Sequence, residues 1–293
     1  MHDDIILKVN HLIKKYDTFE LKDINFELPK GYIMGFVGQN GAGKSTTLKC
    51  IMNLIEYESG NIEVLGKDSK KYSEMIKSKV GYVSEEQYFY EEMTVDWTNK
   101  FVKSFYGEWD QSLLENLLNR FHIDRTKTVK ELSKGMKVKL SVAHALAHNP
   151  KLLILDEPTS GLDPVARNEL MELFLDIIQD EDRSILFSSH ITSDIEKIAD
   201  YITVINNGRI IVCEEKNELF NKWKIVKADK KYLNTKAASG LKGIEKGEFG
   251  FSGITDNIQA FDKIFHEQFT NGNYLRDKVN LEELLLRLVK EVE

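Results

Sequence analysis

Residues 38–46 read Gly38-Gln39-Asn40-Gly41-Ala42-Gly43-Lys44-Ser45-Thr46 and directly follow the apolar run at 32–37. They match the pattern Gly-x-x-x-x-Gly-Lys-Ser/Thr between a predicted strand and a predicted helix at 44–54. The glycines let successive backbone N–H groups point at phosphate oxygens, and the start of the helix adds the positive end of its dipole. We therefore predict a phosphate-binding loop, in which Lys44 reaches the β- and γ-phosphates and the Ser45 hydroxyl binds Mg²⁺.

An acidic pair follows a second apolar run. Residues 152–155 are Leu-Leu-Ile-Leu and predict a buried strand, with Asp156 and Glu157 directly after it. Open α/β sheets bind ligands at the carboxyl ends of their strands. Asp156 is therefore the candidate carboxylate for Mg²⁺, and Glu157 the candidate for polarising an attacking water. Two adjacent carboxylates more commonly cap a helix or face solvent, but the buried strand before them favours the functional interpretation.

Short apolar runs alternate with helical patterns over the first two thirds of the chain. The predicted strands lie at 5–9, 24–28, 32–37, 61–65, 80–83, 152–155 and 184–189, with a hairpin at 201–213. A helix is predicted at 165–179, and the pattern is helical from about 94 to 150. This alternation predicts an α/β fold with a parallel sheet covered on both faces. The predicted body of the fold closes near residue 215.

The remaining residues, 216–293, have a different composition. Residues 216–240 are rich in lysine, and glycines punctuate the short predicted strands that follow. Asn280 is the predicted N-cap of a final helix, with Glu283 three residues later as in a capping box. We predict a small α+β appendage.

Composition excludes several classes of protein. The 293 residues include 40 Lys+Arg and 47 Asp+Glu, for a formal net charge of −7, which disfavours a general DNA-binding protein. Two cysteines, Cys50 and Cys213, are too few for a disulfide framework and favour a reducing compartment. The charged N-terminus does not fit a signal peptide, and the apolar runs are far shorter than the ~20 residues of a membrane span. The composition predicts a soluble cytosolic protein.

A second glycine-containing loop, Leu132-Ser133-Lys134-Gly135-Met136, opens the predicted helix that runs to about residue 148. With this loop, the chain resembles the ATP-binding subunit of an ABC transporter over about residues 1–215. The resemblance implies a P-loop NTPase core of the ABC ATPase type, with a mixed sheet, a helical subdomain at about 86–150, and Mg²⁺-dependent ATP hydrolysis. It also implies that Ser133, Lys134, Gly135 and Met136 form the signature loop, which caps the γ-phosphate held by a partner subunit.

The resemblance assigns further residues by position. Tyr16 lies where the family stacks an aromatic ring on adenine, and Asp163, in Ser160-Gly-Leu-Asp163, belongs to the loop that couples the two nucleotide sites. His190 corresponds to the switch histidine that contacts the γ-phosphate, so Glu157 and His190 are the implied catalytic pair. Taken singly, a tyrosine in a loop or a histidine at a strand end is usually structural.

The chain departs from the family pattern at Glu85 and in the signature loop. Glu85 stands where the family has a glutamine; its carboxylate can still bind Mg²⁺, and Gln87 is a weaker substitute two residues later. In the signature loop, Lys134 and Met136 replace the more usual glycine and glutamine. His144 and His148 have a spacing that could bind a metal, but no third ligand is evident and none is predicted.

The resemblance also implies partners and a location. It implies a separately encoded multi-span membrane permease, a homodimer or heterodimer of ATPase subunits, no nucleic acid, and a place on the cytoplasmic face of the membrane. The signature variant and the appendage are similar to the export branch, which carries peptides, drugs or lipids. Residues 85–92, with Tyr88, Phe89 and Tyr90, either contact the permease or pack locally. The alternatives are a soluble ABC ATPase acting on translation or nucleic-acid machinery and a regulatory ATP sensor, although Asp156, Glu157 and His190 disfavour the sensor.

Overall fold

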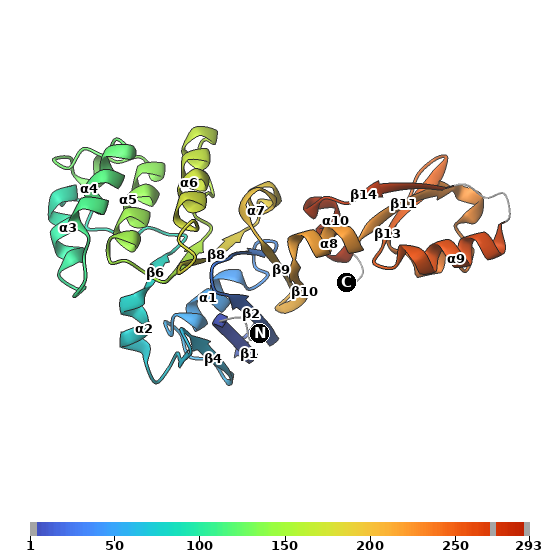
Figure 1. Ribbon diagram of the computed structural model, residues 1–293, viewed down its shortest axis with the longest axis horizontal. Helices are drawn as coiled ribbons and strands as arrows, with labels where there is room; N and C mark the ends of the chain where they lie inside the picture. The colour runs from blue at the N-terminus through green and yellow to red at the C-terminus, as the bar shows by residue number, and fades with distance from the viewer. Residues whose placement is uncertain (1–4, 270–273, 290–293) are drawn as a thin grey trace. The chain divides into compact units, whose positions relative to one another are not determined.

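The computed structural model describes residues 5–269 and 274–289 (Figure 1). The chain divides into two compact units, Met1–Cys213 and Glu214–Glu293, which are described separately here. Among the described residues, none of the helices combines the length and the apolar content that a membrane span requires.

A six-stranded sheet is the centre of the first unit. Its strands, in spatial order, are β10 (Arg209–Glu215), β9 (Tyr201–Asn206), β3 (Ile33–Val37), β8 (Ser184–Ser189), β7 (Leu152–Asp156) and β6 (Val80–Val83). Strand β3 pairs in parallel with β8 and β9, and β7 pairs in parallel with β6 and β8. Asn207 and Gly208 join β9 to β10 with φ of 45° and 73°, as a two-residue hairpin turn with two left-handed residues requires. The predicted α/β fold with a mixed sheet is confirmed.

The first unit also contains a second, antiparallel sheet. The sequence pattern predicted three of its strands but did not assign them to a separate sheet. Its order is β2 (Glu20–Pro29), β1 (Ile5–Lys15), β4 (Ser59–Val64) and β5 (Lys67–Asp68). Leu7 and Phe26 of this sheet share one apolar core with Phe36 of β3 and Leu48 of α1 (Lys44–Ile51). Helix α1 therefore lies in the core between the two sheets.

Helices cover the other face of the central sheet. In β3, Phe36 faces the core that contains α1, whereas Gly35 faces α7 (Thr192–Ile198). A Cβ on Gly35 would lie 2.3 Å from Cγ2 of Ile195, so α7 packs directly on the backbone of β3. The other helices of the unit are α2 (Ser73–Lys79), α3 (Val95–Lys103), α4 (Gln111–Arg120), α5 (Lys134–Ala147) and α6 (Pro164–Ile177), with the 3₁₀ helix η1 (Val129–Glu131).

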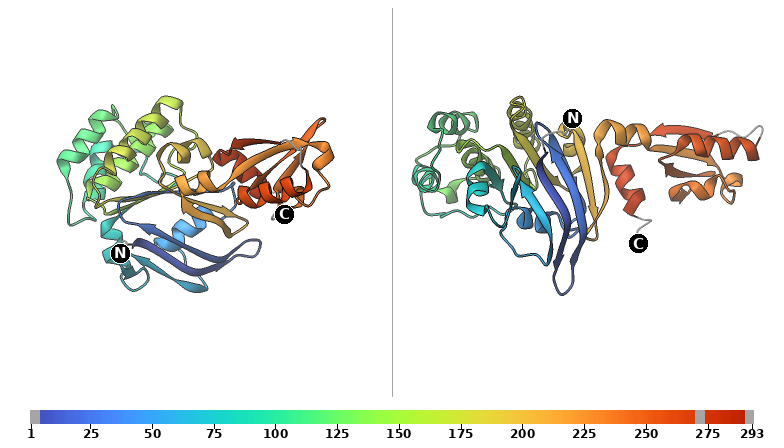
Figure 2. Two further views of the ribbon diagram at one scale, coloured as in Figure 1. Left: turned by 45° about the vertical axis from the view of Figure 1, so that its right-hand side comes forward. Right: turned by 60° about the horizontal axis from the view of Figure 1, so that its bottom comes forward.

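Helices α3, α4 and α5 form a group beside the sheet, as both views of Figure 2 show. Local caps start each of them, because a side-chain oxygen accepts a hydrogen bond from a backbone N–H in the first turn. The caps are Thr94 for α3, Asp110 for α4 and Ser133 for α5. Leu114 and Leu118 of α4 are buried, as is Leu140 of α5.

The second unit is a four-stranded antiparallel sheet with helices. Its strand order is β12 (Lys242–Lys246), β13 (Gly250–Thr255), β11 (Lys224–Asp229) and β14 (Tyr274–Lys278). Helix α9 (Ile258–Gln268) packs Phe261 and Phe265 against Val226 and Phe251 of the sheet. The unit also contains α8 (Lys216–Lys222), α10 (Leu281–Val289) and the 3₁₀ helices η2 (Lys230–Tyr232) and η3 (Ala238–Gly240).

Candidate functional site

The loop at 38–46 joins β3 to α1 and has the conformation that its glycines allow. Gly41 and Gly43 have φ of 81° and 112°, in the left-handed region that favours glycine. At Gly43 there is also no room for a side chain, because a Cβ would lie 2.6 Å from Leu21 Cδ2 and 2.8 Å from Phe19 Cζ. The backbone can therefore turn tightly into the N-terminus of α1.

Lys44 places a buried ammonium against this loop. The residue is 5% exposed, and its Nζ donates to the carbonyl oxygens of Gly38 at 2.7 Å and Gln39 at 3.2 Å. The same Nζ lies 3.1 Å from Oε1 of Glu157. A positive charge is thus held at the position where the sequence predicts phosphate.

Asp156 ends β7 and faces Ser45 across the start of α1. Its Oδ1 accepts hydrogen bonds from the hydroxyls of Ser188 at 2.7 Å and Ser45 at 3.1 Å. Burial raises the pKa of this carboxyl above its usual value, and the hydrogen bonds from the two hydroxyls only partly offset the rise. The hydroxyl and carboxylate oxygens are the hard ligands that Mg²⁺ binds, so this pair fits the predicted ion.

Glu157 and His190 meet between the ends of β7 and β8. Glu157 has φ of 51°, and its N–H donates to the Ser188 hydroxyl at 3.0 Å. Its Oε2 lies 2.7 Å from Nδ1 of His190, whose side chain is 38% exposed. The carboxylate therefore lies between the lysine ammonium on one side and the imidazole on the other.

Among the groups described above, Lys44, Ser45 and Glu157 border a cavity of about 580 Å³. It is lined by Tyr16, Thr18, Phe19, Asn40, Gly41, Gly43, Lys44, Ser45, Thr46, Glu85 and Glu157. Tyr16 is 49% exposed, with Lys14 Nζ 5.0 Å from the centre of its ring. Thr18 and Phe19 were not predicted. No motif marks them, because the contact of Phe19 with Gly43 depends on how β2 packs beside α1.

The structure distinguishes Glu85 from Gln87. Glu85 lines the cavity. Gln87 Nε2 donates to the Ser84 carbonyl at 2.5 Å, and its Oε1 accepts a hydrogen bond from Ser141 of α5. A carboxylate, and not the amide of Gln87, is therefore available to the cavity.

The signature loop and the Asp163 loop start neighbouring helices. The Ser133 hydroxyl accepts from the Met136 N–H at 3.2 Å, and the Asp163 carboxylate accepts from Val165 and Ala166 N–H, each at 3.0 Å. These backbone hydrogen bonds lower the pKa of Asp163. A Cβ on Gly135 would lie 3.5 Å from Leu162 Cδ2. Within residues 5–269 and 274–289, those that line the cavity include neither Asp163 nor Ser133, Lys134, Gly135 and Met136.

His144 and His148 have separate partners. Nε2 of His144 lies 2.7 Å from Oδ1 of Asn99, and burial lowers the pKa of His144 to about 4. The His148 ring stacks on Tyr106 with centroids 4.1 Å apart. In the part of the chain that the structure describes, no group of three or more His, Cys, Asp or Glu residues is arranged to hold a metal ion.

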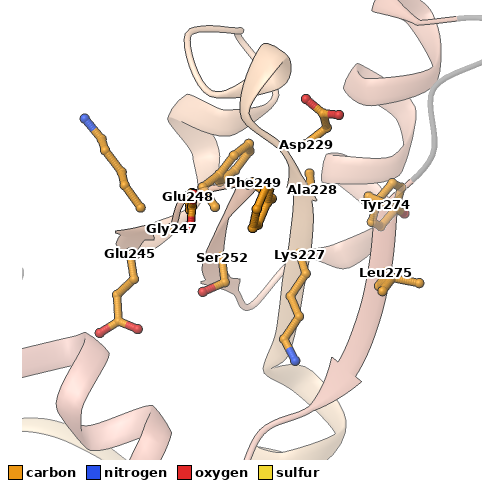
Figure 3. Close-up of a pocket in the computed structure, with 13 residues that line it drawn as sticks. Lys227, Ala228, Asp229, Glu245, Gly247, Glu248, Phe249, Ser252, Tyr274 and Leu275 are labelled. Atoms are coloured by element: carbon orange, nitrogen blue, oxygen red, sulfur yellow. The ribbon is translucent and has the colours of Figure 1, made fainter.

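The second unit has a larger cavity, of about 790 Å³, at one end of its sheet (Figure 3). Phe249 and Leu275 expose apolar surface there. Of the charged side chains, Lys227 pairs with Asp277 at 2.6 Å and Glu245 lies 3.4 Å from Arg287. Lys44, Ser45, Glu85 and Glu157 instead line the smaller cavity.

Comparisons with known proteins show the family of the chain. The family model described as "ABC transporter" matches residues 21–160. The lantibiotic transport ATP-binding protein SrtF of Streptococcus pyogenes is 38% identical over 74% of this chain and 96% of its own length. The bacitracin transport ATP-binding protein BcrA of Bacillus licheniformis is 34% identical over 70% of this chain and 68% of its own.

The fold has the same relatives. A solved structure described as the ATP-binding subunit of an ABC transporter superposes with a TM-score of 0.67 and 30% identity, covering 74% of this chain and 92% of that one. The residues that the family model matches, 21–160, include Lys44 and Asp156. The chain therefore belongs to the ABC transporter family, as an ATP-binding subunit that hydrolyses ATP.

Proposed function

We propose that this chain powers a membrane permease that exports amphipathic antimicrobial peptides, using ATP bound between two ATPase subunits. The observation that carries the proposal is the arrangement of Lys44 and Glu157 at one cavity, with His190 bound to Glu157 and the Ser45–Asp156 pair at the start of α1. Residues 1–215 form the proposed ATPase domain, with a helical subdomain at about 86–150, and residues 216–293 form an accessory domain.

Lys44 and Glu157 suit the two stages of the reaction. Before ATP binds, the ammonium pairs with Oε1 of Glu157 at 3.1 Å. The β- and γ-phosphates compete for that ammonium, so ATP binding releases Oε1 to accept a proton from the attacking water. His190 keeps the other oxygen, Oε2, at 2.7 Å, which fixes the direction of the carboxylate. Tyr16, at the cavity, is the proposed contact for adenine.

The oxygen ligands beside this pair suit a divalent ion. Ser45, Asp156 and Glu85 are the residues that would hold Mg²⁺. Held by these residues, Mg²⁺ would supply stabilisation of the negative charge on the phosphoryl oxygens. Ser188 holds Asp156 Oδ1 at 2.7 Å, so the carboxylate is already oriented.

Two ATPase subunits complete each site. Among the described residues, those that line the cavity do not include Ser133, Gly135 or Asp163. These three lie at the starts of the neighbouring helices α5 and α6. A helix N-terminus that presents a hydroxyl and backbone N–H groups binds phosphate well. We therefore propose that Ser133–Met136 of one subunit cap the γ-phosphate held by another, in a homodimer or a heterodimer.

Exposed aromatic rings on the helical subdomain form the proposed permease contact. Tyr90 is 60% exposed, Trp97 40% and Phe105 70%. Trp97 stacks on Phe101 with centroids 5.0 Å apart, and Phe101 lies 5.1 Å from Phe105. We call these four residues the aromatic strip. Phe89, by contrast, is partly buried and packs edge-on against His144, so only part of the segment at 85–92 is available for a partner.

The class of cargo follows from the relatives. SrtF and BcrA carry lantibiotic and bacitracin transport in their names, and both substrates are peptides. We propose that the permease, and not the ATPase subunit, selects the peptide.

The test is purification of the full-length tagged chain from its native cells in mild detergent, followed by mass spectrometry. A multi-span membrane protein recovered in stoichiometric amount supports the proposal. Recovery of ribosomes or nucleic-acid machinery, or of the chain alone, contradicts it and favours a soluble ABC ATPase.

A variant of the aromatic strip sharpens the same test. Trp97→Asp is expected to lose the membrane protein while ATP binding is retained. Tyr72→Asp is the matched control, because Tyr72 is an aromatic residue of similar exposure, 39%, that does not belong to the aromatic strip.

A further inference from the structure

A buried carboxylate lies behind the Glu157–His190 pair. Asp194, in α7, is 4% exposed. Its Oδ2 accepts a hydrogen bond from the Thr159 hydroxyl at 2.8 Å, and its Oδ1 accepts one from Nε of Arg167 at 2.5 Å. Nη2 of Arg167 contacts the same Oδ1. One side chain therefore joins three segments that are distant in the sequence.

Each of these segments carries a residue of the site. Thr159 follows shortly after Glu157, at the end of β7. Arg167 lies one turn into α6, which begins after its N-cap Asp163. Asp194 itself lies in the first turn of α7, which begins shortly after His190. The Asp194 carboxylate is thus the point at which the backbones leading to Glu157, Asp163 and His190 are tied together.

Helix α7 is a fixed base for this carboxylate. Ile195, the neighbour of Asp194, is fully buried and packs against the bare α-carbon of Gly35 in the central sheet. Ala199 packs on the same glycine. Because α7 rests on the sheet backbone, Asp194 is presented to Thr159 and Arg167 from a position that has little freedom to move.

Glu157 needs support of this kind. Its φ of 51° lies in the left-handed region, which a non-glycine residue adopts only when its surroundings hold it there. The Ser188 hydroxyl holds its N–H, and its carbonyl accepts from Ser160 N–H at 3.1 Å. The Thr159–Asp194 hydrogen bond fixes the backbone just beyond Glu157 to α7.

We propose that Asp194 is a positioning residue for ATP hydrolysis: by binding Thr159 and Arg167, it holds Glu157 against His190 and sets the direction of the loop that ends at Asp163. The inference rests on the proposed function, in which Glu157 accepts the proton of water. Of the described residues, those that line the cavity do not include Asp194, Thr159 or Arg167, so the three act through Glu157 and not on ATP itself.

Replacing the hydroxyl tests the link without changing the shape. Thr159→Val keeps the volume but leaves Oδ2 of Asp194 without its donor, which disfavours the present position of a buried carboxylate. Small displacements of an aligned catalytic group lower rates steeply. We expect kcat to fall about 10-fold or more, with the KM and the Kd for ATP within about twofold. Thr159→Ser, which keeps the hydroxyl, restores most of kcat.

Asn168→Ala is the matched control. Lys197 Nζ donates to Asn168 Oδ1 at 2.5 Å, so this contact also joins α6 to α7, but both residues are exposed. Its loss is expected to leave kcat unchanged. Arg167→Lys is a second variant, in case Thr159→Val does not fold. It keeps the positive charge but loses the fork of N–H donors, and kcat is expected to fall while ATP binding is kept.

Glu157→Gln distinguishes a failure of the role of Asp194 from a failure of the proposed function. If Glu157→Gln abolishes turnover while Thr159→Val and Arg167→Lys hydrolyse ATP at the normal rate, the role of Asp194 is overturned and the proposed function stands. If Glu157→Gln itself retains turnover, the proposed function fails. A fall of kcat in Thr159→Ser as large as in Thr159→Val, or a parallel loss of ATP binding, shows a general structural role and overturns the inference.

Discussion

In the first unit, the buried charges of Lys44 and Glu157 border a cavity of about 580 Å³, whereas in the second unit the buried charge of Arg287 lies between α10 and the sheet. Arg287 is 3% exposed. Its Nη1 donates to the Gly243 carbonyl at 3.0 Å, and its Nη2 lies 2.9 Å from both Ser252 Oγ and Glu283 Oε1.

The two units differ in whether another group can replace the present partners of the buried charge. Arg287 is bound by groups that its own fold supplies, so any change of partner requires α10 to move. Lys44 and Glu157 are bound to each other at the edge of a cavity, where a phosphate can take the lysine without moving a helix. Buried charge therefore stabilises the fold in one unit and is available for chemistry in the other.

Glu157→Gln gives the largest expected effect. The amide keeps the size of the carboxylate but cannot accept a proton from water, so ATP hydrolysis is expected to fall by about 100-fold or more while ATP remains bound. Phosphate release measures the first quantity and fluorescence of a nucleotide analogue the second. The free energy of unfolding is expected not to fall, because the charge does not hold the fold.

Lys44→Ala is the control for that variant, since it is expected to weaken ATP binding itself by about 10- to 100-fold. Near-normal turnover in Glu157→Gln would contradict the difference between the two units. It would show that the buried carboxylate of Glu157 has a structural role, like the guanidinium of Arg287.

His144 differs from Lys44 and Glu157, because it is a buried titratable group of the first unit that does not line the cavity. Its pKa is lowered from 6.5 to about 4 by burial, so the folded state keeps it neutral. Its contribution to stability is complete above pH 6.5 and is lost as the pH falls toward 4, because only the unfolded chain then binds the proton. We expect a loss of about 2 kcal/mol between pH 7 and pH 5.

Urea unfolding of the wild type and of His144→Gln measures this. Glutamine can keep a hydrogen bond to Asn99 and does not titrate, so its stability should decline less over the same interval. Equal slopes in the two proteins would show that the pKa of His144 is the same in the folded and the unfolded chain.

Local patterns predicted the parts of the site that depend on neighbouring residues. The loop at 38–46 and the pair Asp156–Glu157 follow from backbone chemistry within a few residues, and the strands at 80–83 and 184–189 lie at the predicted positions. Strand β1 was predicted to end at residue 9 but continues to Lys15. The apolar alternation is interrupted there by His11, whose φ is 51° and where the pairing with β2 is irregular.

Contacts between distant segments could not be predicted in the same way. In the last helix, the structure buries Arg287 together with Leu281, Leu284 and Leu288. Periodicity cannot reveal a buried arginine whose partners, Gly243 and Ser252, come from other strands. The predicted N-cap Asn280 is confirmed, since its Oδ1 accepts from Glu283 N–H at 2.8 Å, whereas the Glu283 carboxylate binds Arg287.

Arg287→Ala tests the other side of the comparison. Loss of the guanidinium leaves the Gly243 carbonyl and the Ser252 hydroxyl without this partner, so the second unit is expected to lose about 1–2 kcal/mol of stability. ATP hydrolysis by the first unit is expected to stay within about twofold. Leu286→Ala is the control, because Leu286 is 51% exposed on the same helix. Thermal unfolding gives the stability, and phosphate release gives the rate. Loss of hydrolysis at constant stability would contradict the assignment.

The smallest effect is expected when the second unit is removed altogether, by ending the chain at Cys213. Every residue that lines the ATP cavity, and every partner of Lys44, Asp156 and Glu157 described here, belongs to the first unit. ATP binding by the shortened chain is therefore expected within about twofold of the full-length protein, as measured by nucleotide fluorescence. A loss of 10-fold or more in a shortened chain that still folds would show that the second unit contributes to the ATP site. The buried charges that stabilise the fold and the buried charges that take part in chemistry would then not belong to separate units.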